Sequence, residues 1–275
     1  MPDEASGPAP ARAVAVREVP FRGGGFRPRT NSYVSWAVFA GLILLWEAGS
    51  RLGLISPIAL PAPSQVLGAL VDLARTGMLW KNLSVSLMRL GTGWVLGSIL
   101  GIAVGLAIGL FTVARAALMQ LTSALFAVPK IALLPLFIVW FGIGESSKIA
   151  TILFGTFFPA VIATYSGVDN VDRNLIRMGQ SFGLSWGSIV RKIILPGALP
   201  AILSGLRISS AIAIVLLVAA EMIGAQYGIG AYILQAGSLF AIDQLIAGVT
   251  ILAVLGLLIS WVIARAERRF LDWRS

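Results

Sequence analysis

Residues 87–111 read LMRLGTGWVLGSILGIAVGLAIGLF, and this stretch decides the class of fold. It carries a single charged residue and is longer than the roughly 20 apolar residues that cross the hydrocarbon core of a bilayer as an α-helix. A glycine recurs at every fourth position, at Gly93, Gly97, Gly101, Gly105 and Gly109. Because this spacing places the glycines along one face, the stretch predicts a membrane-crossing helix that packs closely against another helix.

Five further apolar stretches have similar lengths, at about residues 33–50, 118–141, 148–168, 197–222 and 244–264. The stretch at 118–141 is interrupted by Pro129 and Pro135, which remove helical hydrogen bonds. The pattern therefore predicts an all-α, polytopic membrane protein with six transmembrane helices, in a single membrane domain at residues 33–275.

The composition agrees with this class. Hydrophobic residues make up 57% of the chain and charged residues only 12%, against about 25% charged in soluble proteins. The net charge of +9 does not indicate nucleic-acid binding, because the basic residues are scattered over short loops. The chain has no Cys and no His, which excludes disulfides, thiol catalysis and His-based metal or acid–base sites.

Residues 1–32 differ from the rest, being rich in Ala, Pro, Gly and Arg. We expect a disordered cytoplasmic tail. A cleaved secretory signal does not fit, because the segment is long, contains acidic residues and is followed by no small-residue cleavage site.

The basic residues orient the predicted helices. If both chain termini lie on the same side of the membrane, fourteen basic residues lie on that side. They are Arg12, Arg17, Arg22, Arg27, Arg29, Arg115, Arg173, Arg177, Arg191, Lys192, Arg265, Arg268, Arg269 and Arg274. The other side holds Arg51, Arg75, Lys81, Arg89 and Lys148. Because Lys and Arg accumulate in cytoplasmic loops, both termini are expected in the cytoplasm.

The largest predicted cytoplasmic loop spans about residues 169–196 and has helical signals of its own. Asn170 or Asp172 can cap a first short helix, and Gly183 can supply the left-handed turn that ends it. Ser185 can cap a second short helix, and Pro196 is expected to start the fifth membrane span. The loop thus predicts a compact cytoplasmic knob of two helices.

This loop resembles that of permease subunits of ATP-binding-cassette (ABC) importers. Their pattern is E-A-A, three residues, Gly, nine residues, I-x-L-P. Here Gly183 is followed after nine residues by Ile193-Ile194-Leu195-Pro196. The E-A-A triplet falls on Arg177-Met178-Gly179, so a salt bridge made by the family's acidic residue has no counterpart here. The knob geometry depends on Gly183 and the I-x-L-P end.

Further motifs resemble the nitrate, sulfonate and taurine branch of that family. They are LPAPS at 60–64, AVPKIALLPL at 127–136, WFGIGE at 140–145, LPGALP at 195–200, AEM at 220–222 and YGIG at 227–230. The resemblance extends from about Trp46 to the C-terminus.

The resemblance implies a homodimeric permease in the bacterial inner membrane, served by a periplasmic substrate-binding protein and two copies of a separate ATPase. The knob would contact the ATPase through Arg177, Met178, Gly179, Gly183, Ile193, Leu195 and Pro196. No G-x-x-x-x-G-K-[ST] loop occurs in the sequence, so ATP and Mg²⁺ are expected on the partner ATPase, with no cofactor, catalytic residue or metal site here.

Charged residues inside predicted spans are costly and are candidates for function. Lys130 and Arg207 are expected near the middle of the bilayer, where they can form a cationic path for an anion. The alternative is that both reach toward the interface or bond carbonyl groups. For Glu221, near the outer end of the fifth span, a structural or gating contact is favoured over substrate binding.

Two other classes are weighed against an ATP-driven importer. A secondary transporter driven by an ion gradient predicts acidic residues near the midplane and two similar halves, and neither pattern is found. An intramembrane enzyme needs a nucleophile–base pair, and none is found in the spans. The resemblance to the nitrate, sulfonate and taurine branch implies a small solute, usually an anion such as a sulfonate, nitrate, taurine or carboxylate; the branch also carries some organic cations and neutral precursors.

Overall fold

The computed structural model describes residues 32–56 and 58–270, and every regular element in these ranges is helical. Residues up to Trp46 and those from Glu47 onward form two separate units. Residues 1–31 of the predicted tail lie outside the described residues, and Ser32, the last residue of that predicted tail, begins α1.

The elements follow one another without a strand in the described ranges. They are α1 (Ser32–Arg51), α2 (Pro63–Arg75), α3 (Met78–Leu110), α4 (Thr112–Phe126), the 3₁₀-helix η1 (Lys130–Leu133), α5 (Leu134–Phe141), α6 (Glu145–Asp169), α7 (Arg173–Ser181), α8 (Trp186–Ile189), the π-helix η2 (Val190–Ile194), α9 (Leu195–Met222), α10 (Ile229–Ser238) and α11 (Ile242–Phe270).

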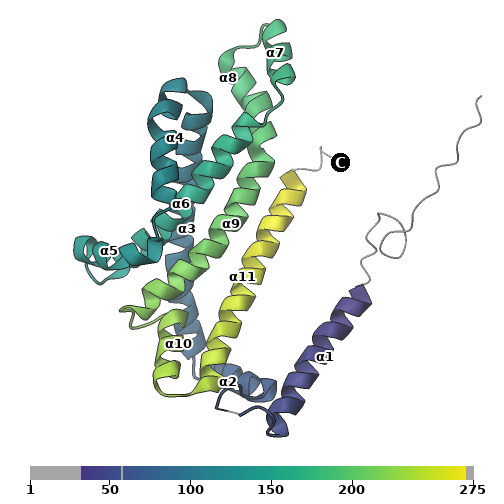
Figure 1. The fold of residues 1–275 in the computed structure, drawn as a ribbon, viewed down its shortest axis with the longest axis vertical. Coiled ribbons are helices and arrows are strands. Elements are labelled where there is room, and N and C mark those ends of the chain that lie inside the picture. Colours follow the sequence, from purple (N-terminus) through teal and green to yellow (C-terminus); the bar gives the residue numbers. More distant parts are fainter. Residues whose placement is uncertain (1–31, 57, 271–275) are drawn as a thin grey trace, which may run out of the picture. The chain divides into compact units, whose positions relative to one another are not determined.

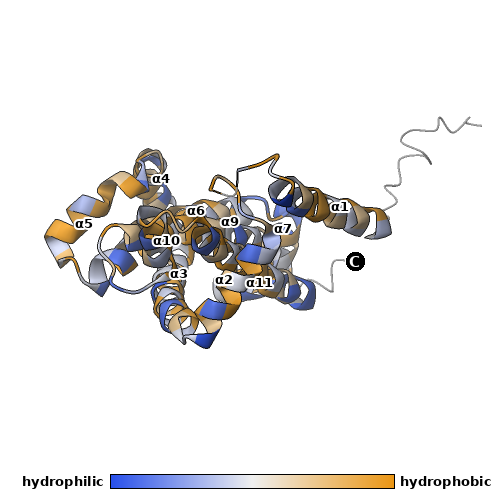
Figure 2. Ribbon diagram, turned by 90° about the horizontal axis from the view of Figure 1, so that it is seen from below, coloured by the Kyte–Doolittle hydropathy of each residue, from blue (hydrophilic) through white to orange (hydrophobic). Residues whose placement is uncertain are grey.

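The prediction of a six-span helical membrane protein is confirmed. Five helices are long and apolar enough to cross a membrane, and the pair at 112–126 and 130–141 makes a sixth if counted as one span. The two halves of that pair meet at an angle of 92°. The bend lies at residues 127–129, so the predicted interruption beside Pro129 is present. Figure 2 shows α5, the second half of the pair, as mostly hydrophobic.

Close contact between α3 and α6 organises the unit from Glu47 onward, with α6 lying between α3 and α9 (Figure 1). A Cβ atom at Gly97 would lie 2.2 Å from Oγ1 of Thr156, and one at Gly101 only 2.6 Å from the carbonyl oxygen of Phe157. The predicted glycine face is therefore confirmed, and its partner is α6.

The other face of α6 is packed as closely against α9. A Cβ at Gly155 would lie 1.9 Å from Cδ1 of Leu216, and a Cβ at Gly205 would lie 2.2 Å from that of Ala163. Glycines of α3 at one contact, and Gly155 of α6 with Gly205 of α9 at the other, thus let three long helices pack closely, as is usual where lipid supplies no hydrophobic driving force between helices.

Three features of the helices differ from the prediction. Helix α3 begins at Met78, about nine residues early, because its polar first turns bury Asn82, Ser86 and Arg89 among protein partners. Helix α10 was not predicted. Pro196 lies in the first turn of α9, as predicted, but no break precedes it, since residues 186–222 form one continuous helical segment.

The start of α2 is stabilised by residues on both sides of its first turn. Ala62, not Ser64, is the N-cap residue, and its amide donates to the side chain of Gln65 at 2.9 Å. Glu47 supplies the cap, because its carboxylate accepts from the Ser64 amide at 3.0 Å and from the Ser64 hydroxyl at 2.8 Å. A carboxylate is stabilised at a helix N-terminus by the free amides there.

The two ends of the long helices carry different elements (Figure 1). Helices α7 and α8 lie at one end, and α2 and α10 at the other. Helix α9 begins beside α8 and ends before α10, so it links the two ends over about 40 Å at 1.5 Å per residue.

A matched pair of substitutions in α3 tests the packing. Gly101→Ala is expected to destabilise the protein by about 1–3 kcal/mol, because the added methyl overlaps the backbone of α6. Gly91→Ala is the control, since its Cβ would meet nothing within 4 Å and alanine favours helix. Thermal unfolding of the purified protein in detergent measures both, and equal melting temperatures would contradict the packing argument.

Candidate functional site

The knob predicted in the loop is formed by α7 and α8. The Asp172 carboxylate caps α7 by accepting from the Asn174 amide at 2.8 Å, and the Ser185 hydroxyl caps α8 by accepting from the Ser188 amide. Gly183 has a φ of +71°. The Leu184 amide donates to the Gly179 carbonyl and the Gly183 amide to that of Gln180. This is the Schellman arrangement, which requires the left-handed residue at Gly183.

Gly179, the third residue of the altered triplet, is where α7 meets the π-helix η2 that follows α8. It is buried, and a Cβ there would lie 2.9 Å from Cδ1 of Ile193. Arg177 and Met178, the other two residues of the triplet, are exposed. The family pattern identified Gly179 only because it occupies the third position of the E-A-A triplet. Its close contact with Ile193 of the I-x-L-P segment depends on the fold.

A π-helical segment joins the knob to the membrane span. The Leu195 amide donates to the Val190 carbonyl, one residue farther back than in an α-helix. Pro196 has no amide hydrogen to donate and its ring would crowd the preceding turn of an α-helix, so a widened turn accommodates it. The knob therefore continues into α9 without a flexible link.

The knob presents an apolar surface and a groove. Leu175, Met178, Phe182 and Trp186 are all exposed. A groove of about 600 Å³ runs between α7 and the start of α9, lined among others by Leu175, Met178 and Pro196. An exposed apolar surface of this kind on a polar segment is typical of a docking site for another protein.

A second group of functional candidates lies at the opposite end of α9, around Glu221. The Glu221 side chain is completely buried. Its carboxylate accepts from the Ser86 hydroxyl at 2.8 and 3.0 Å, from Arg89 Nη1 at 2.8 Å and from the Gly230 amide at 2.8 Å. Three donors, with the Ser86 hydroxyl lying within hydrogen-bonding distance of both carboxylate oxygens, hold this buried carboxylate in place.

Arg89 joins two carboxylates from different helices. Its Nη1 also donates to the Tyr227 carbonyl at 2.7 Å, while Nε and Nη2 donate to the two oxygens of Glu145 at 2.5 and 2.6 Å. The arginine thus connects α3, the start of α6, the end of α9 and the following loop. Paired, bidentate contacts of this kind are the strong ones among charged hydrogen bonds.

The loop before α10 is held by the same cluster. The Asn82 side chain accepts from the Gly228 amide and the Ser86 hydroxyl from the Ile229 amide, each at 2.9 Å. Gly228 has a φ of +139°, and a Cβ there would lie 2.4 Å from the Glu221 carboxyl carbon. Only glycine fits at this position.

The sequence pointed to Glu221 but not to its partners Ser86 and Arg89, nor to Asn82 and Glu145, which complete the cluster. Arg89 was counted among the outer-side basic residues that orient the helices, although it also lies inside an apolar stretch. The rule that intramembrane charges are functional candidates, applied to Arg89 as well, would have found the centre of the cluster.

Lys130 and Arg207 lie apart from this cluster. Lys130 donates to the Phe126 carbonyl, and its ammonium group lies 4.4 Å from the centroid of the Phe126 ring. Arg207 forms an ion pair with Glu267 of α11. Among the described residues, no hydrogen bond or ion pair joins Lys130, Arg207 and Glu221 to one another.

Tyr227 is also held in place at this end. The Lys81 ammonium lies 3.7 Å from the centroid of the Tyr227 ring. Hydrogen bonding to Lys81, and then its positive charge, lowers the pKa of the Tyr227 phenol. Both contacts fix the loop that follows α9.

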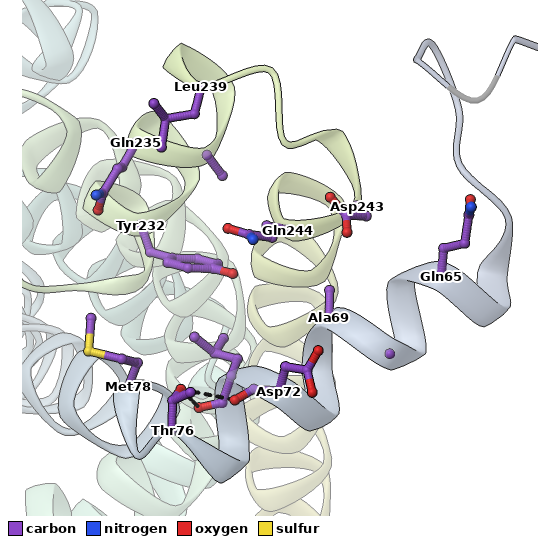
Figure 3. A pocket seen from close by; sticks show the side chains of 13 residues that line it. Gln65, Ala69, Asp72, Thr76, Met78, Tyr232, Gln235, Leu239, Asp243 and Gln244 are labelled. Atoms are coloured by element: carbon purple, nitrogen blue, oxygen red, sulfur yellow. Dashed lines mark hydrogen bonds between the residues drawn. The ribbon is translucent and has the colours of Figure 1, made fainter.

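A cavity of about 530 Å³ lies between α2, α10 and α11 (Figure 3). Its polar side chains include Asp72, Tyr232, Gln235, Asp243 and Gln244. The lining contains two carboxylates and no Lys or Arg, so its charge disfavours an anion.

Three permeases are similar in sequence to this chain over most of its length. A putative aliphatic sulfonates transport permease protein of Escherichia coli K12 is 39% identical over 86% of this chain and 90% of its own length. A taurine transport system permease protein of the same organism is 38% identical over 88% and 90%. A putative aliphatic sulfonates transport permease protein of Bacillus subtilis 168 is 35% identical over 100% and 98%.

Solved structures share the fold. The MetNI methionine ABC transporter in an inward-facing conformation matches with a TM-score of 0.59 and 21% identity, over 71% of this chain and 95% of that chain. An amino acid ABC transporter matches with a TM-score of 0.56 and 18% identity, over 73% and 97%.

The family description that matches residues 97–272 covers the last part of α3 and every element from α4 to α11, and so includes the knob, Glu145 and Glu221, while Asn82, Ser86 and Arg89 lie before it. It reads "Binding-protein-dependent transport system inner membrane component". The chain belongs to this family and is the multi-pass membrane permease component of an ABC importer, distinct from the ATPase.

Proposed function

We propose that this permease carries an aliphatic sulfonate, such as taurine or an alkanesulfonate, into the cytoplasm as one of two identical subunits. Two copies of a separate ATPase bind ATP and Mg²⁺ and act on the knob, and a periplasmic binding protein delivers the solute at the opposite end. Both termini and the knob are cytoplasmic, in line with the distribution of basic residues.

The observation that carries the proposal is the continuous path from knob to membrane. The knob is internally rigid, with capped helices and the tight contact between Gly179 and Ile193. It continues through the π-helical turn into α9, whose far end holds Glu221. A push on the knob by an ATPase therefore moves α9 as a rod, which is the simplest way to couple nucleotide binding to solute movement.

The bent pair of helices at residues 112–126 and 130–141 supports the proposal that the permease works as two identical subunits. Helix α5 has eight residues, so it spans only about 12 Å and cannot cross the bilayer alone. Val139 and Trp140 are exposed on it. Broken helices at membrane depth are tolerated where protein or a water-filled cavity covers them, and a second permease supplies such a cover.

The relatives' descriptions support the sulfonate, and Lys130 supports an anion route. Lys130 lies beside the break in the helix, and no carboxylate pairs with it in the part of the chain that the structure describes. A partly exposed cation at such a break can attract a negatively charged solute. Arg207 belongs to the same proposed route, with Glu267 as its resting partner.

The coupling is tested by Gly183→Val, which places a β-branched residue at a φ of +71°. We expect the variant to insert but to lose stimulation of ATP hydrolysis by the loaded binding protein, because the Schellman turn cannot form. Gly183→Asn should retain part of the stimulation, since asparagine tolerates this conformation. Gly187→Val in α8 is the control, having open space around it. Full stimulation in a correctly inserted Gly183→Val importer would show that the knob does not transmit.

The orientation is tested with single cysteines, which need no background removal because the chain has none. Asn174 in the knob and Gln226 at the other end are both exposed. An impermeant thiol reagent added to intact cells should label Asn174→Cys only after the membrane is opened, and Gln226→Cys directly. The opposite labelling pattern would reverse the orientation.

The anion route is tested by Lys130→Met and Arg207→Met in the complete importer. Each should slow ethanesulfonate uptake into proteoliposomes while basal ATP hydrolysis persists, because the attraction for the anion is lost. Lys130→Arg should retain more transport than Lys130→Met, as it keeps the charge. Native uptake rates in both methionine variants would rule out this route.

A further inference from the structure

We propose that one edge of the Arg89 guanidinium, together with Lys148, is a sulfonate-binding site, and that the Glu145 carboxylate occupies this site until the solute displaces it. The inference rests on the proposed function, since it takes the cargo to be a sulfonate. It adds a specificity-determining site at the end of the helices opposite the knob, apart from Lys130.

The two edges of the Arg89 side chain have different partners. Nη1 donates to Glu221 at 2.8 Å and to the Tyr227 carbonyl at 2.7 Å. Nε and Nη2 donate only to Glu145. Nη1 therefore helps to hold the end of α9 in place. Nε and Nη2 form a two-pronged donor (the fork) that binds only the Glu145 carboxylate, and another anion can replace that carboxylate. A guanidinium fork of this geometry binds two oxygens of any planar or tetrahedral oxyanion.

The two carboxylates differ in the same way. The Glu221 side chain is 0% exposed and has further donors in Ser86 and Gly230, while the Glu145 side chain is 47% exposed. In the described residues, Arg89 is the only side chain that hydrogen-bonds to Glu145. Releasing Glu145 to water thus costs one ion pair, whereas releasing Glu221 would leave a buried charge without partners.

Lys148 supplies a second buried cation beside the fork. It is only 4% exposed, and its ammonium group donates to the Ile143 and Gly144 carbonyls, each at 2.9 Å. An ammonium group has three hydrogens, so one remains for a ligand. A lysine buried to this degree without a carboxylate of its own is costly unless it serves a negatively charged partner.

A cavity of about 320 Å³ gives access to both cations. Arg89, Glu145 and Lys148 line it, together with Gln226 and Tyr227 of the loop after α9. This volume lies at the lower end of the range of small-molecule sites, which matches a solute with two or three carbon atoms.

The charges agree with a monoanionic ligand. Arg89 and Lys148 carry two positive charges, which Glu221 and Glu145 balance. When Glu145 swings into water, one positive charge remains unbalanced and one sulfonate neutralises it. The free amides at the start of α6, whose first residue is Glu145, add to the attraction for an anion.

The experiment measures ethanesulfonate binding by calorimetry to the assembled permease–ATPase complex in nanodiscs, without the binding protein. Glu145→Gln should bind about tenfold more tightly than the native complex, because a neutral amide competes less well for the fork than a carboxylate. Lys148→Met should bind at least about tenfold more weakly, and Lys148→Arg should stay close to native, because a charged hydrogen bond is stronger than a neutral one.

Two controls separate this site from general charge effects. Asp72→Asn removes an exposed carboxylate at the same end, outside the 320 Å³ cavity, and should leave the affinity unchanged. Ethyl methyl sulfone, a neutral probe of similar shape, should not bind. If the complex with Lys148→Met fails to assemble, the ethanesulfonate affinities of Glu145→Gln and Lys148→Arg test the site instead.

The outcomes distinguish this inference from the proposed function. Equal affinities in the native complex, Glu145→Gln and Lys148→Met would overturn the site, as would binding of the sulfone. If the complete native importer still transports ethanesulfonate in proteoliposomes, only the site is wrong. If it transports no sulfonate, the proposed cargo and the site fall together.

Discussion

The close approach of α3 and α6 is the constraint on which the rest of the molecule depends. Five glycines in α3 bring its backbone against α6, and Gly155 and Gly205 bring α6 and α9 together in the same way. In lipid, helix association relies on packing and on hydrogen bonds between helices. The three helices therefore form one rigid layer, against which the bent pair, the knob and the loop before α10 are positioned.

This layer brings the polar residues of three helices to one point. Arg89 of α3, Glu145 of α6 and Glu221 of α9 meet because their helices pack without intervening side chains. Breaking the Arg89–Glu221 pair would leave an uncompensated buried charge. Glycine packing and the charge cluster thus reinforce each other at one end of the unit, while the knob lies at the other.

The charged residues in the apolar stretches fall into two groups. Arg89, Glu221 and Arg207 have carboxylate or guanidinium partners, whereas Lys130 and Lys148 bond to carbonyl groups. A cation paired with a carboxylate serves the fold at rest. A cation held only by carbonyl oxygens keeps its attraction for a passing anion, which is why the two lysines are the more informative positions for the solute.

The sequence by itself determined the helical membrane fold, the glycine face, the break beside Pro129 and the knob, because each depends on local periodicity or on a residue's backbone preference. Gly183 is the clearest example, since its left-handed conformation follows from the residue type and its place after a helix. Only the tertiary structure decided what Arg89 touches, why Gly179 must be small and how Pro196 lies within a continuous helix. Glu145 and Glu221 reach Arg89 from positions 56 and 132 residues away in the chain, and no local pattern encodes such a meeting.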